Sequence, residues 1–502
     1  MTEPFTRIDA LPSHVGESVV LNGWLHNRRG SKGLAFLVLR DGTGFVQVVV
    51  NAEAVGDETF AVASGLSQES AVRVAGTVRA DERQEGGVEV QAERVELLAA
   101  AEDYPITPKE HGVEFLMDRR HLWLRSRRQW AVMRVRNRII QSIHAYFQEE
   151  GYIQMDAPVL TGNAVEGTST LFGMEYFDDA AYLTQSGQLH GEAMAFAHGK
   201  IYTFGPTFRA EKSKTRRHLT EFWMIEPEMA FYDLAMNMEV AEELLARICG
   251  DALAHCQAEL DVLERDTTAL RTSATGGFPR LSYTEAVELL TSAETAELLD
   301  AEAAAAAEER AALDAETADL DARYGQAKKG EKRRIDARRI EIGARVKELD
   351  ELDRNLPQWR RSALEFEWGA DLGGSDETVL TKHFDRPLIV HRYPAAVKAF
   401  YMKRDPEDDR LALGMDVLAP EGYGEIVGGG ERATDLQFLR DQIAAHGLPE
   451  SAFDWYLDLR RYGTVPHAGF GLGLERTVAW VCGLAHVRET IPFPRLIGRI
   501  HP

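Results

Sequence analysis

The chain has 502 residues and a formal net charge of −23, with 57 Lys or Arg against 80 Asp or Glu. This length exceeds what one ordinary hydrophobic core organises, so we expect two or more domains. The acidic balance excludes a protein that binds polyanions over its whole surface, although a local basic patch can still bind phosphate. The N-terminal segment lacks a basic region followed by an apolar run, and no apolar stretch is long enough to cross a bilayer. We therefore expect a cytoplasmic protein with no membrane attachment.

Residues 1–103 have the pattern of a small β-barrel. Five short runs rich in β-branched and aromatic residues are separated by turn signals, at 19–26, 34–39, 45–50, 71–78 and 88–95. A small polar segment precedes the fourth run, and five strands with one insertion fit an OB-fold barrel. Pro105 and Pro108 then indicate a linker over residues 104–116.

Residues 117–502 mix helices and strands, which indicates an α/β (α+β) domain. A long helix over about 127–150 leads through Gly151 into a strand that ends at Pro158. Further strands are expected near 181–184, 201–204 and 220–230.

Residues 293–357 interrupt this domain with two series of apolar residues spaced seven apart. The series are Leu299, Ala306, Leu313 and Leu320, and then Ile335, Ile342, Leu349 and Leu356. This spacing predicts two helices folded back on each other as a coiled-coil-like hairpin. The first arm is acidic, whereas the tip and second arm are rich in Lys and Arg, so the arms can pair electrostatically. A plain inserted hairpin and a basic tip that contacts RNA or a partner both stay open.

Two segments about 260 residues apart carry residue types that suit a nucleotide. Arg209 opens a charged loop between two strands, where a cation can bind the α-phosphate as negative charge builds on it. The glycine-rich segment 469–476 lets backbone approach a flat ligand and ends in Arg476, at the start of a helix. With the C-terminal segment 492–495, these segments resemble the second and third signatures of class II aminoacyl-tRNA synthetases.

The resemblance implies an antiparallel sheet flanked by helices, with Arg209 and Arg476 as catalytic residues. It places Glu211 at the adenine edge, His218 at the γ-phosphate, and Phe222 under the adenine ring, with Arg476 over the other face of that ring. The implied ATP-binding set is Arg209, Glu211, Arg217, His218, Phe222, Glu425 and Arg476. The helix, strand and proline over 127–158 resemble the first signature, which builds the dimer interface in that family, so we expect a homodimer.

Asp416 and Glu425 are two carboxylates that a hairpin could bring together. Magnesium favours one or two carboxylates together with phosphate oxygens and water. Beside the ATP motifs, the two residues predict a Mg²⁺ site.

Apart from the hairpin, the chain resembles the aspartyl, asparaginyl and lysyl subgroup, whose members carry an N-terminal OB domain. The resemblance implies that Glu166 and Gln188 hold the α-ammonium of an amino acid and that Arg432 reads its side chain. Aspartyl members have lysine in place of Gly191 and aspartate in place of Glu226.

Both differences favour a carboxamide over a carboxylate. Without the lysine, a carboxylate loses one cationic partner, whereas Arg432 can donate to the carbonyl of asparagine and Glu226 can accept from its NH₂ group. Glu226 would also repel a carboxylate. We therefore expect an asparagine–tRNA ligase that forms asparaginyl-adenylate and pyrophosphate from L-asparagine and ATP. It would then transfer asparagine to the 3′ end of tRNA(Asn).

The barrel would read the anticodon of that tRNA. OB barrels stack bases on aromatic side chains and hydrogen-bond to base edges. The residues that the resemblance implies for this role are Arg28, Arg29, Phe36 and Gln47.

Three alternatives stay open at this point. One is an aspartyl-tRNA synthetase, which Gly191 and Glu226 oppose. Another is an asparagine synthetase-like enzyme on the same fold, which the N-terminal barrel opposes. The third is a non-catalytic RNA-binding paralogue, which the presence of Arg209, Glu425 and Arg476 opposes.

Overall fold

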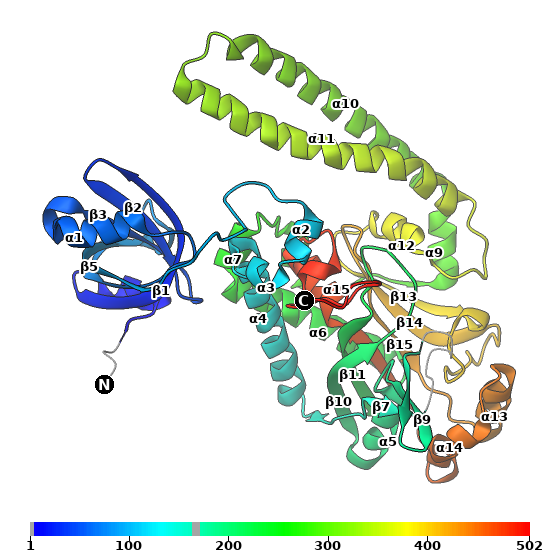
Figure 1. Ribbon diagram of the computed structural model, residues 1–502. Coiled ribbons are helices and arrows are strands. Elements are labelled where there is room, and N and C mark those ends of the chain that lie inside the picture. Colours follow the sequence, from blue (N-terminus) through cyan, green and yellow to red (C-terminus); the bar gives the residue numbers. More distant parts are fainter. Residues whose placement is uncertain (1–4, 163–170) are drawn as a thin grey trace. The chain divides into compact units, whose positions relative to one another are not determined.

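The computed structural model describes residues 5–162 and 171–502 (Figure 1). The chain divides into two compact units, Met1–Arg125 and Ser126–Pro502, which are described separately. The first contains the barrel, and the second contains a large sheet with its helices and the hairpin.

The N-terminal unit is a closed five-stranded barrel with strand order β1-β2-β3-β5-β4, as expected. Its strands are β1 (Ser18–Ser31), β2 (Leu34–Arg40), β3 (Phe45–Asn51), β4 (Ala71–Ala80) and β5 (Val88–Ala99). On β2 the alternate residues Ala35, Leu37 and Leu39 are buried in the barrel core, so Phe36 lies on the outer face. The segment before β4, expected only as a polar insertion, forms helix α1 (Ala52–Gly65), capped by the Asn51 side chain. Helices α2 (Val113–Met117) and α3 (Arg120–Trp123) follow the barrel.

The second unit is built on an eight-stranded, mostly antiparallel sheet with strand order β12-β13-β14-β15-β16-β11-β10-β6. The strands are β6 (Ile153–Gln154), β10 (Lys200–Phe208), β11 (Glu221–Ala230), β12 (Arg280–Ser282), β13 (Leu388–Pro394), β14 (Leu411–Ala419), β15 (Gly424–Glu431) and β16 (His467–Gly473). A small sheet has the order β7-β9-β8, with β7 (Leu160–Thr161), β8 (Gly173–Tyr176) and β9 (Asp179–Leu183). The strand expected to end at Pro158 is shorter than predicted, because only β6 pairs there, in parallel with β10.

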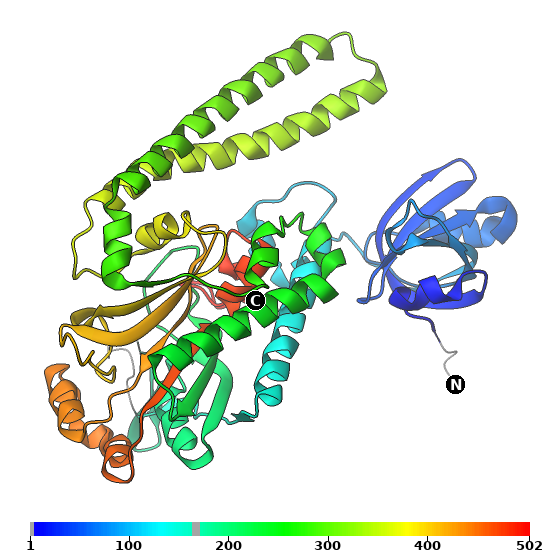
Figure 2. The same ribbon diagram turned by 180° about the vertical axis from the view of Figure 1, so that it is seen from behind.

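Helices surround the large sheet. They are α4 (Arg127–Glu149), α5 (Gln188–His198), α6 (Leu234–His255), α7 (Gln257–Val262), α8 (Thr268–Ser273), α9 (Tyr283–Leu290), α12 (Gly374–Thr381), α13 (Leu436–Ala445), α14 (Asp454–Arg461) and α15 (Leu474–Cys482). Residues of α4, α6 and α15 share one hydrophobic core with Ile225 and Met229 of β11. Figure 2 shows α4 (cyan) and α6 (green) beside each other. Side chains alternate between the two faces of a strand, so Phe222, Met224, Glu226 and Glu228 face the other side of the sheet.

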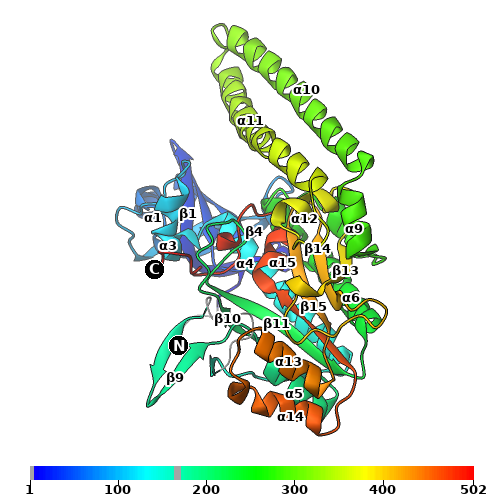
Figure 3. The ribbon, with the colours of Figure 1, turned by 90° about the vertical axis from the view of Figure 1, so that its right-hand side faces the viewer.

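The insertion is a hairpin of two long helices, α10 (Ala293–Tyr324) and α11 (Lys329–Leu364), as predicted (Figure 3). All eight residues of the two heptad series are buried. Leu299 and Leu356 join a core with α9 and α12 at the root, and the outer layers form a separate core along the arms. The second helix continues to Leu364, seven residues beyond the predicted end of the hairpin at residue 357.

Cys249, Cys256 and Cys482 are buried thiols without disulfide bonds. In the described ranges 5–162 and 171–502, no helix combines the length and apolar character that a membrane span requires.

Candidate active site

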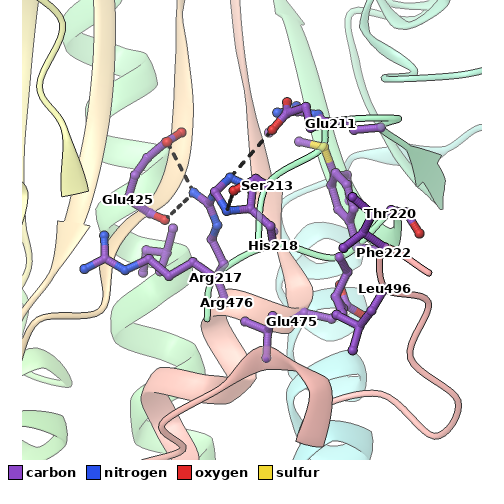
Figure 4. Close-up of a pocket in the computed structure, with 18 residues that line it drawn as sticks. Glu211, Ser213, Arg217, His218, Thr220, Phe222, Glu425, Glu475, Arg476 and Leu496 are labelled. Carbon is purple, nitrogen blue, oxygen red and sulfur yellow. Dashed lines mark hydrogen bonds and ion pairs between the residues drawn. The ribbon is translucent and has the colours of Figure 1, made fainter. Parts of the chain in front are cut away.

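Strand β11 and the loop between β10 and β11 build one wall of a polar pocket in the second unit. The pocket and its open mouth together leave about 800 Å³ free of protein atoms. Phe222 and Glu425 lie on opposite sides of it (Figure 4). The guanidinium of Arg209 lies over the Phe222 ring, 5.4 Å from its centroid. An aromatic face and a cation therefore meet at the place where a base and a phosphate were expected.

The loop between these strands carries His218, Glu211 and Arg217. The Nε2 atom of His218 lies 3.7 Å from a carboxylate oxygen of Glu211, and its Nδ1 contacts the Thr215 hydroxyl. Burial and the nearby Arg476 lower the pKa of His218 from its ordinary 6.5, so its imidazole is mostly neutral near pH 7.

Arg217 is held by helix α12, a contact that the sequence did not reveal. Its guanidinium donates to Glu377 Oε2 at 2.9 Å, to the Thr378 hydroxyl at 3.0 Å and to the carbonyl of Gly422 at 2.5 Å. Glu377 also accepts the backbone N–H of Glu425 at 3.1 Å. The helix that follows the hairpin therefore orients an arginine of the pocket.

Arg476 and Glu425 contact each other across the ends of β15 and α15. The Nη1 atom of Arg476 donates to the backbone carbonyl of Glu425 at 2.9 Å and to its carboxylate at 3.3 Å. Burial opposes ionisation of Glu425, but Arg476, Lys398 and Arg209 hold its pKa below the ordinary value. Glu425 is therefore an anion among cations at neutral pH.

The two carboxylates predicted to bind metal converge on one face of the β14–β15 hairpin. Asp416 pairs with Gly428, and an irregularity in the ladder follows, so that Leu418 pairs with Glu425. The extra residue restores the parity that puts Glu425 on the face of Asp416. A methyl group at Gly428 would lie 2.7 Å from Glu425 Oε1 and 3.3 Å from Asp416 Oδ1. The oxygens therefore approach the same point.

Lys398 occupies the other side of Asp416, with 2.7 Å between Nζ and Oδ2. Burial raises the pKa of Asp416, Glu425 adds to this, and Lys398 opposes it. Among the described residues, no group of three or more His, Cys, Asp or Glu is arranged to hold a metal ion. At this position the protein thus provides two carboxylates as possible metal ligands, together with a lysine that balances part of their charge.

A second cluster lies further along β11, where Glu228 and Arg432 form a buried ion pair. Arg432 Nη2 donates to Glu228 Oε1 at 2.5 Å, and neither side chain is more than 2% exposed. Burial raises the pKa of Glu228 to about 8, against the opposing effect of Arg432. Arg432, which was expected to bind the side chain of the substrate, thus already forms an ion pair with a carboxylate of the protein.

Glu226 is fixed next to this pair by neutral donors. It accepts hydrogen bonds from the Ser186 hydroxyl, from the Gly187 N–H at 2.7 Å and from the Thr203 hydroxyl at 3.3 Å. A Cβ atom at Gly191 would lie 3.1 Å from Glu228 Cγ. Because glycine has no side chain, the space beside Glu228 stays free at this position.

Glu192 anchors the far side of this cluster. It accepts from Arg460 at 2.7 Å, from the Tyr456 hydroxyl at 2.8 Å and from Gln188 Nε2 at 3.1 Å, and His467 lies 3.0 Å away. Burial opposes its ionisation, but Arg460 and His467 hold its pKa well below the usual range. Gln188 thereby lies beside the acidic cluster.

The strand β11 sets the distance between the two sites. Phe222 and Glu226 are four residues apart on one face, which at about 3.3 Å per residue is about 13 Å. The pocket and the acidic cluster therefore lie next to each other along one face of β11.

In the barrel, three of the four predicted anticodon residues meet on the outer face. Arg29 pairs with Phe36 in the β1–β2 ladder, its guanidinium lies 5.5 Å from the ring centroid, and it donates to Gln47 Oε1 at 2.8 Å. Arg28 turns away and contacts the backbone carbonyl of Ser64 at the end of α1. The barrel thus presents an aromatic face with a cation and an amide beside it.

Glu166 lies outside the described residues. The sequence missed Glu228, Glu192, Arg460, Lys398 and Glu377. For Glu228 a signal was present, since a residue two positions after Glu226 shares its face of the strand. For the others, only the fold brings together residues far apart along the chain.

Comparisons with known proteins agree with this architecture. The family model for class II tRNA synthetases (D, K and N) matches residues 112–497, and an OB-fold nucleic acid binding domain matches residues 19–98. The chain is 51% identical over 501 residues to an asparagine–tRNA ligase of Sorangium cellulosum, covering 100% of this chain and 99% of that protein. It is 47% identical over 499 residues to an asparagine–tRNA ligase of Deinococcus deserti, covering 99% and 100% of the two.

A solved structure of asparaginyl-tRNA synthetase from Pyrococcus horikoshii, complexed with asparaginyl-adenylate, superposes with a TM-score of 0.81 at 38% identity, covering 100% of each chain. With its OB barrel, its signature-bearing sheet and this full-length similarity, the chain belongs to the class II aminoacyl-tRNA synthetases of the aspartyl, lysyl and asparaginyl subgroup.

Proposed function

We propose that this protein is an asparagine–tRNA ligase, which activates L-asparagine with ATP and transfers it to tRNA(Asn). The observation that carries the choice of amino acid is the charge of the second cluster. Among the described residues of this cluster, three carboxyl groups, Glu192, Glu226 and Glu228, face two arginines, and Gly191 adds no cation. Fully ionised, the cluster has one negative charge in excess, and the pKa of Glu228, raised to about 8 by burial, indicates that this last ionisation needs a further cation near neutral pH. The α-ammonium of an amino acid would balance the excess negative charge, whereas a second carboxylate on its side chain would add to it. The full-length similarity to two asparagine–tRNA ligases supports the same choice.

In the first step, the carboxylate of asparagine attacks the α-phosphorus of ATP, and pyrophosphate leaves. No protein nucleophile is required, so positioning and charge stabilisation supply the catalysis. Phe222 would stack on adenine, with Glu211 at its edge and Arg476 over its other face, while Arg209 would bind the α-phosphate where charge accumulates. His218 and Arg217 complete the polar wall on the side of the terminal phosphates.

Asp416 and Glu425 fit a magnesium ion, because their oxygens approach the open position at Gly428 and Mg²⁺ needs few carboxylates when phosphates and water fill its shell. When bound, Mg²⁺ would neutralise phosphate charge. Lys398 would keep Asp416 oriented through its other oxygen.

In the second step, the terminal ribose 3′-hydroxyl of tRNA attacks the acyl carbon, and AMP leaves. We propose that Phe36 stacks on an anticodon base while Arg29 and Gln47 read base edges. Arg28 would contact the phosphate backbone at most, since its side chain turns away from the other three.

We further propose a cytoplasmic homodimer. The segment that follows α4 exposes apolar residues, with Ile153, Val159 and Leu160 each at least 39% exposed. Such a patch is typical of a subunit interface.

Amino-acid-dependent exchange of pyrophosphate into ATP, measured with asparagine and with aspartate, tests the function. We expect strong exchange with asparagine and little with aspartate, followed by charging of tRNA(Asn). Equal use of both amino acids would favour an aspartyl-type enzyme instead. Ammonia-dependent conversion of aspartate in the absence of tRNA would favour an asparagine synthetase-like enzyme.

A further inference from the structure

We propose that the tip of the α10–α11 hairpin is a second tRNA-binding surface, which contacts the phosphate backbone outside the anticodon. This inference rests on the proposed function, because it takes tRNA as the polyanion that the chain handles. Neither the adenylation chemistry nor the anticodon patch requires the hairpin.

The excess positive charge of the hairpin is concentrated at its tip. Along the arms, arginines are paired across the helices with acidic residues. These pairs are Arg338–Glu316, Arg345–Glu309, Arg360–Asp300, Arg310–Asp350 and Arg339–Asp321. Each exposed pair contributes little stability, but together they neutralise these five arginines. Acidic residues outnumber basic ones along the arms, so the excess of positive charge is confined to the tip.

The tip is different. Residues 324–334 contain five Lys or Arg and one Glu, in a chain whose net charge is −23. Lys328, Lys329, Arg333 and Arg334 are exposed, and within ranges 5–162 and 171–502 none of them forms an ion pair. An unneutralised basic cluster on an acidic protein suits a nucleic-acid phosphate backbone, since binding releases counterions.

The hairpin also holds this cluster at a defined place. From Leu299 at the root to Tyr324 are 25 residues, or about 40 Å of helix. Tyr324 closes the tip by packing against Lys332 and Arg339, whose cations lie 5.0 Å and 4.5 Å from its ring centroid. A buried heptad core runs along the arms, so the cations are carried on a stiff support.

Polar contacts fix the root and the lower arm to the catalytic unit. Thr295 of α10 contacts His383 at 2.9 Å, and Ser362 of α11 donates to Asp376 of α12 at 2.6 Å. Glu351 of α11 lies 3.5 Å from Arg216, in the loop of the nucleotide pocket. A rigid arm binds with less loss of conformational freedom than a flexible tail of equal charge. The tip is therefore suited to contact the body of a tRNA whose 3′ end lies in the same unit.

The test compares Arg333→Gln/Arg334→Gln at the tip with Lys347→Gln/Arg354→Gln on the arm. Both pairs lie on α11, are exposed and form no ion pair among the described residues, so the two variants lose equal charge from one helix. The dissociation constant for a labelled tRNA(Asn) transcript is measured by fluorescence anisotropy at several salt concentrations. Asparagine-dependent pyrophosphate exchange is measured without tRNA.

We expect the tip variant to weaken tRNA binding about tenfold or more at about 0.1 M salt, because it loses one or two phosphate contacts that each strengthen binding about five- to eightfold at that salt concentration. The affinity of the variant should also depend less steeply on salt concentration, by the slope of one to two phosphate contacts. The arm variant should change binding less than threefold, and both should keep wild-type exchange. Equal effects of the two variants, or wild-type binding by the tip variant, would overturn the proposal and leave the tip to another partner. Absence of asparagine-dependent exchange in the wild type would instead refute the proposed function.

A shortened hairpin separates position from charge. Deleting residues 307–320 and 335–348 removes two heptads from each arm, keeps the heptad phase and the tip cations, and draws the tip back by about 21 Å. We expect the same loss of tRNA affinity as in the tip variant, with exchange retained. Wild-type affinity in the shortened chain would contradict a contact that depends on the reach of the arm.

Discussion

The substitution Glu226→Gln tests the charge of the amino-acid pocket most directly. Glutamine keeps the shape of the side chain and removes the negative charge. Its one carbonyl oxygen can accept from the Gly187 N–H while its NH₂ group donates to the Ser186 hydroxyl, which can also act as an acceptor. A substrate carboxylate about 4 Å from Glu226 would be repelled by about 4 kcal/mol at an effective dielectric constant of about 20. Asparagine, with a neutral side chain, would not be repelled.

The measurement is kcat/KM for pyrophosphate exchange with each amino acid. Because 1.36 kcal/mol corresponds to a factor of ten, the preference for asparagine over aspartate should fall by up to about a thousandfold. We expect at least a tenfold fall, since Glu228 remains in place. Glu259→Gln is the control, because Glu259 is a buried carboxylate in α7 that pairs with Arg134. A Glu226→Gln enzyme with the wild-type preference would refute the electrostatic account.

The same pocket predicts a pH dependence. Burial raises the pKa of Glu228 to about 8, so a proton on this carboxyl is lost as the pH rises toward that value. The α-ammonium of asparagine binds better to the ionised carboxylate, so KM for asparagine should fall between about pH 6.5 and 8, by up to tenfold per pH unit. Glu226 contributes to the raised pKa of Glu228, so removing the charge of Glu226 lowers the pKa of Glu228. In Glu226→Gln the fall should therefore end at lower pH, and a KM independent of pH in the wild type would contradict the charge count.

Three further outcomes follow from the geometry. Gly428→Ala puts a methyl group between Asp416 and Glu425, so pyrophosphate exchange should fall at least a hundredfold at low Mg²⁺ with little change in melting temperature. Phe36→Ala removes a stacking face worth about 1–3 kcal/mol, so KM for tRNA should rise about 5- to 150-fold while exchange stays unchanged. Leu160→Asp puts a charge on the exposed apolar patch, so light scattering should give the mass of one chain rather than two; a dimeric variant would place the interface elsewhere.

The periodicity of apolar residues along the sequence predicted the hairpin helices and the barrel strands. The two heptad series of the hairpin are buried as expected, because a repeat of seven specifies a helical seam without reference to the rest of the chain. The barrel strands were found for a similar reason, although α1 was missed, since its residues carry only a weak amphipathic pattern interrupted at Gly56.

The ion pairs of the candidate site could not be predicted from local periodicity. Arg432 and Glu228 lie 204 residues apart and meet only because β15, β16 and β11 are neighbours in the sheet. Glu425 shares a face with Asp416 only through the irregularity in the β14–β15 ladder, which periodicity alone would not place. Arg217 likewise finds Glu377 through α12, which follows a long insertion in the chain.

The arrangement along β11 explains how, under the proposed function, one strand could contact both the nucleotide and the amino acid of the adenylate. Phe222, Met224, Glu226 and Glu228 share a face, while Ile225 and Met229 pack into the core beneath. An adenylate joins a base to an amino acid through a phosphate, so the two recognition sites must be held at a fixed separation, and the strand rise supplies it. Substitutions at single positions of this face would alter specificity one feature at a time. Insertion of one residue between Phe222 and Glu226 would instead turn both glutamates toward the apolar core and disrupt substrate binding and folding together.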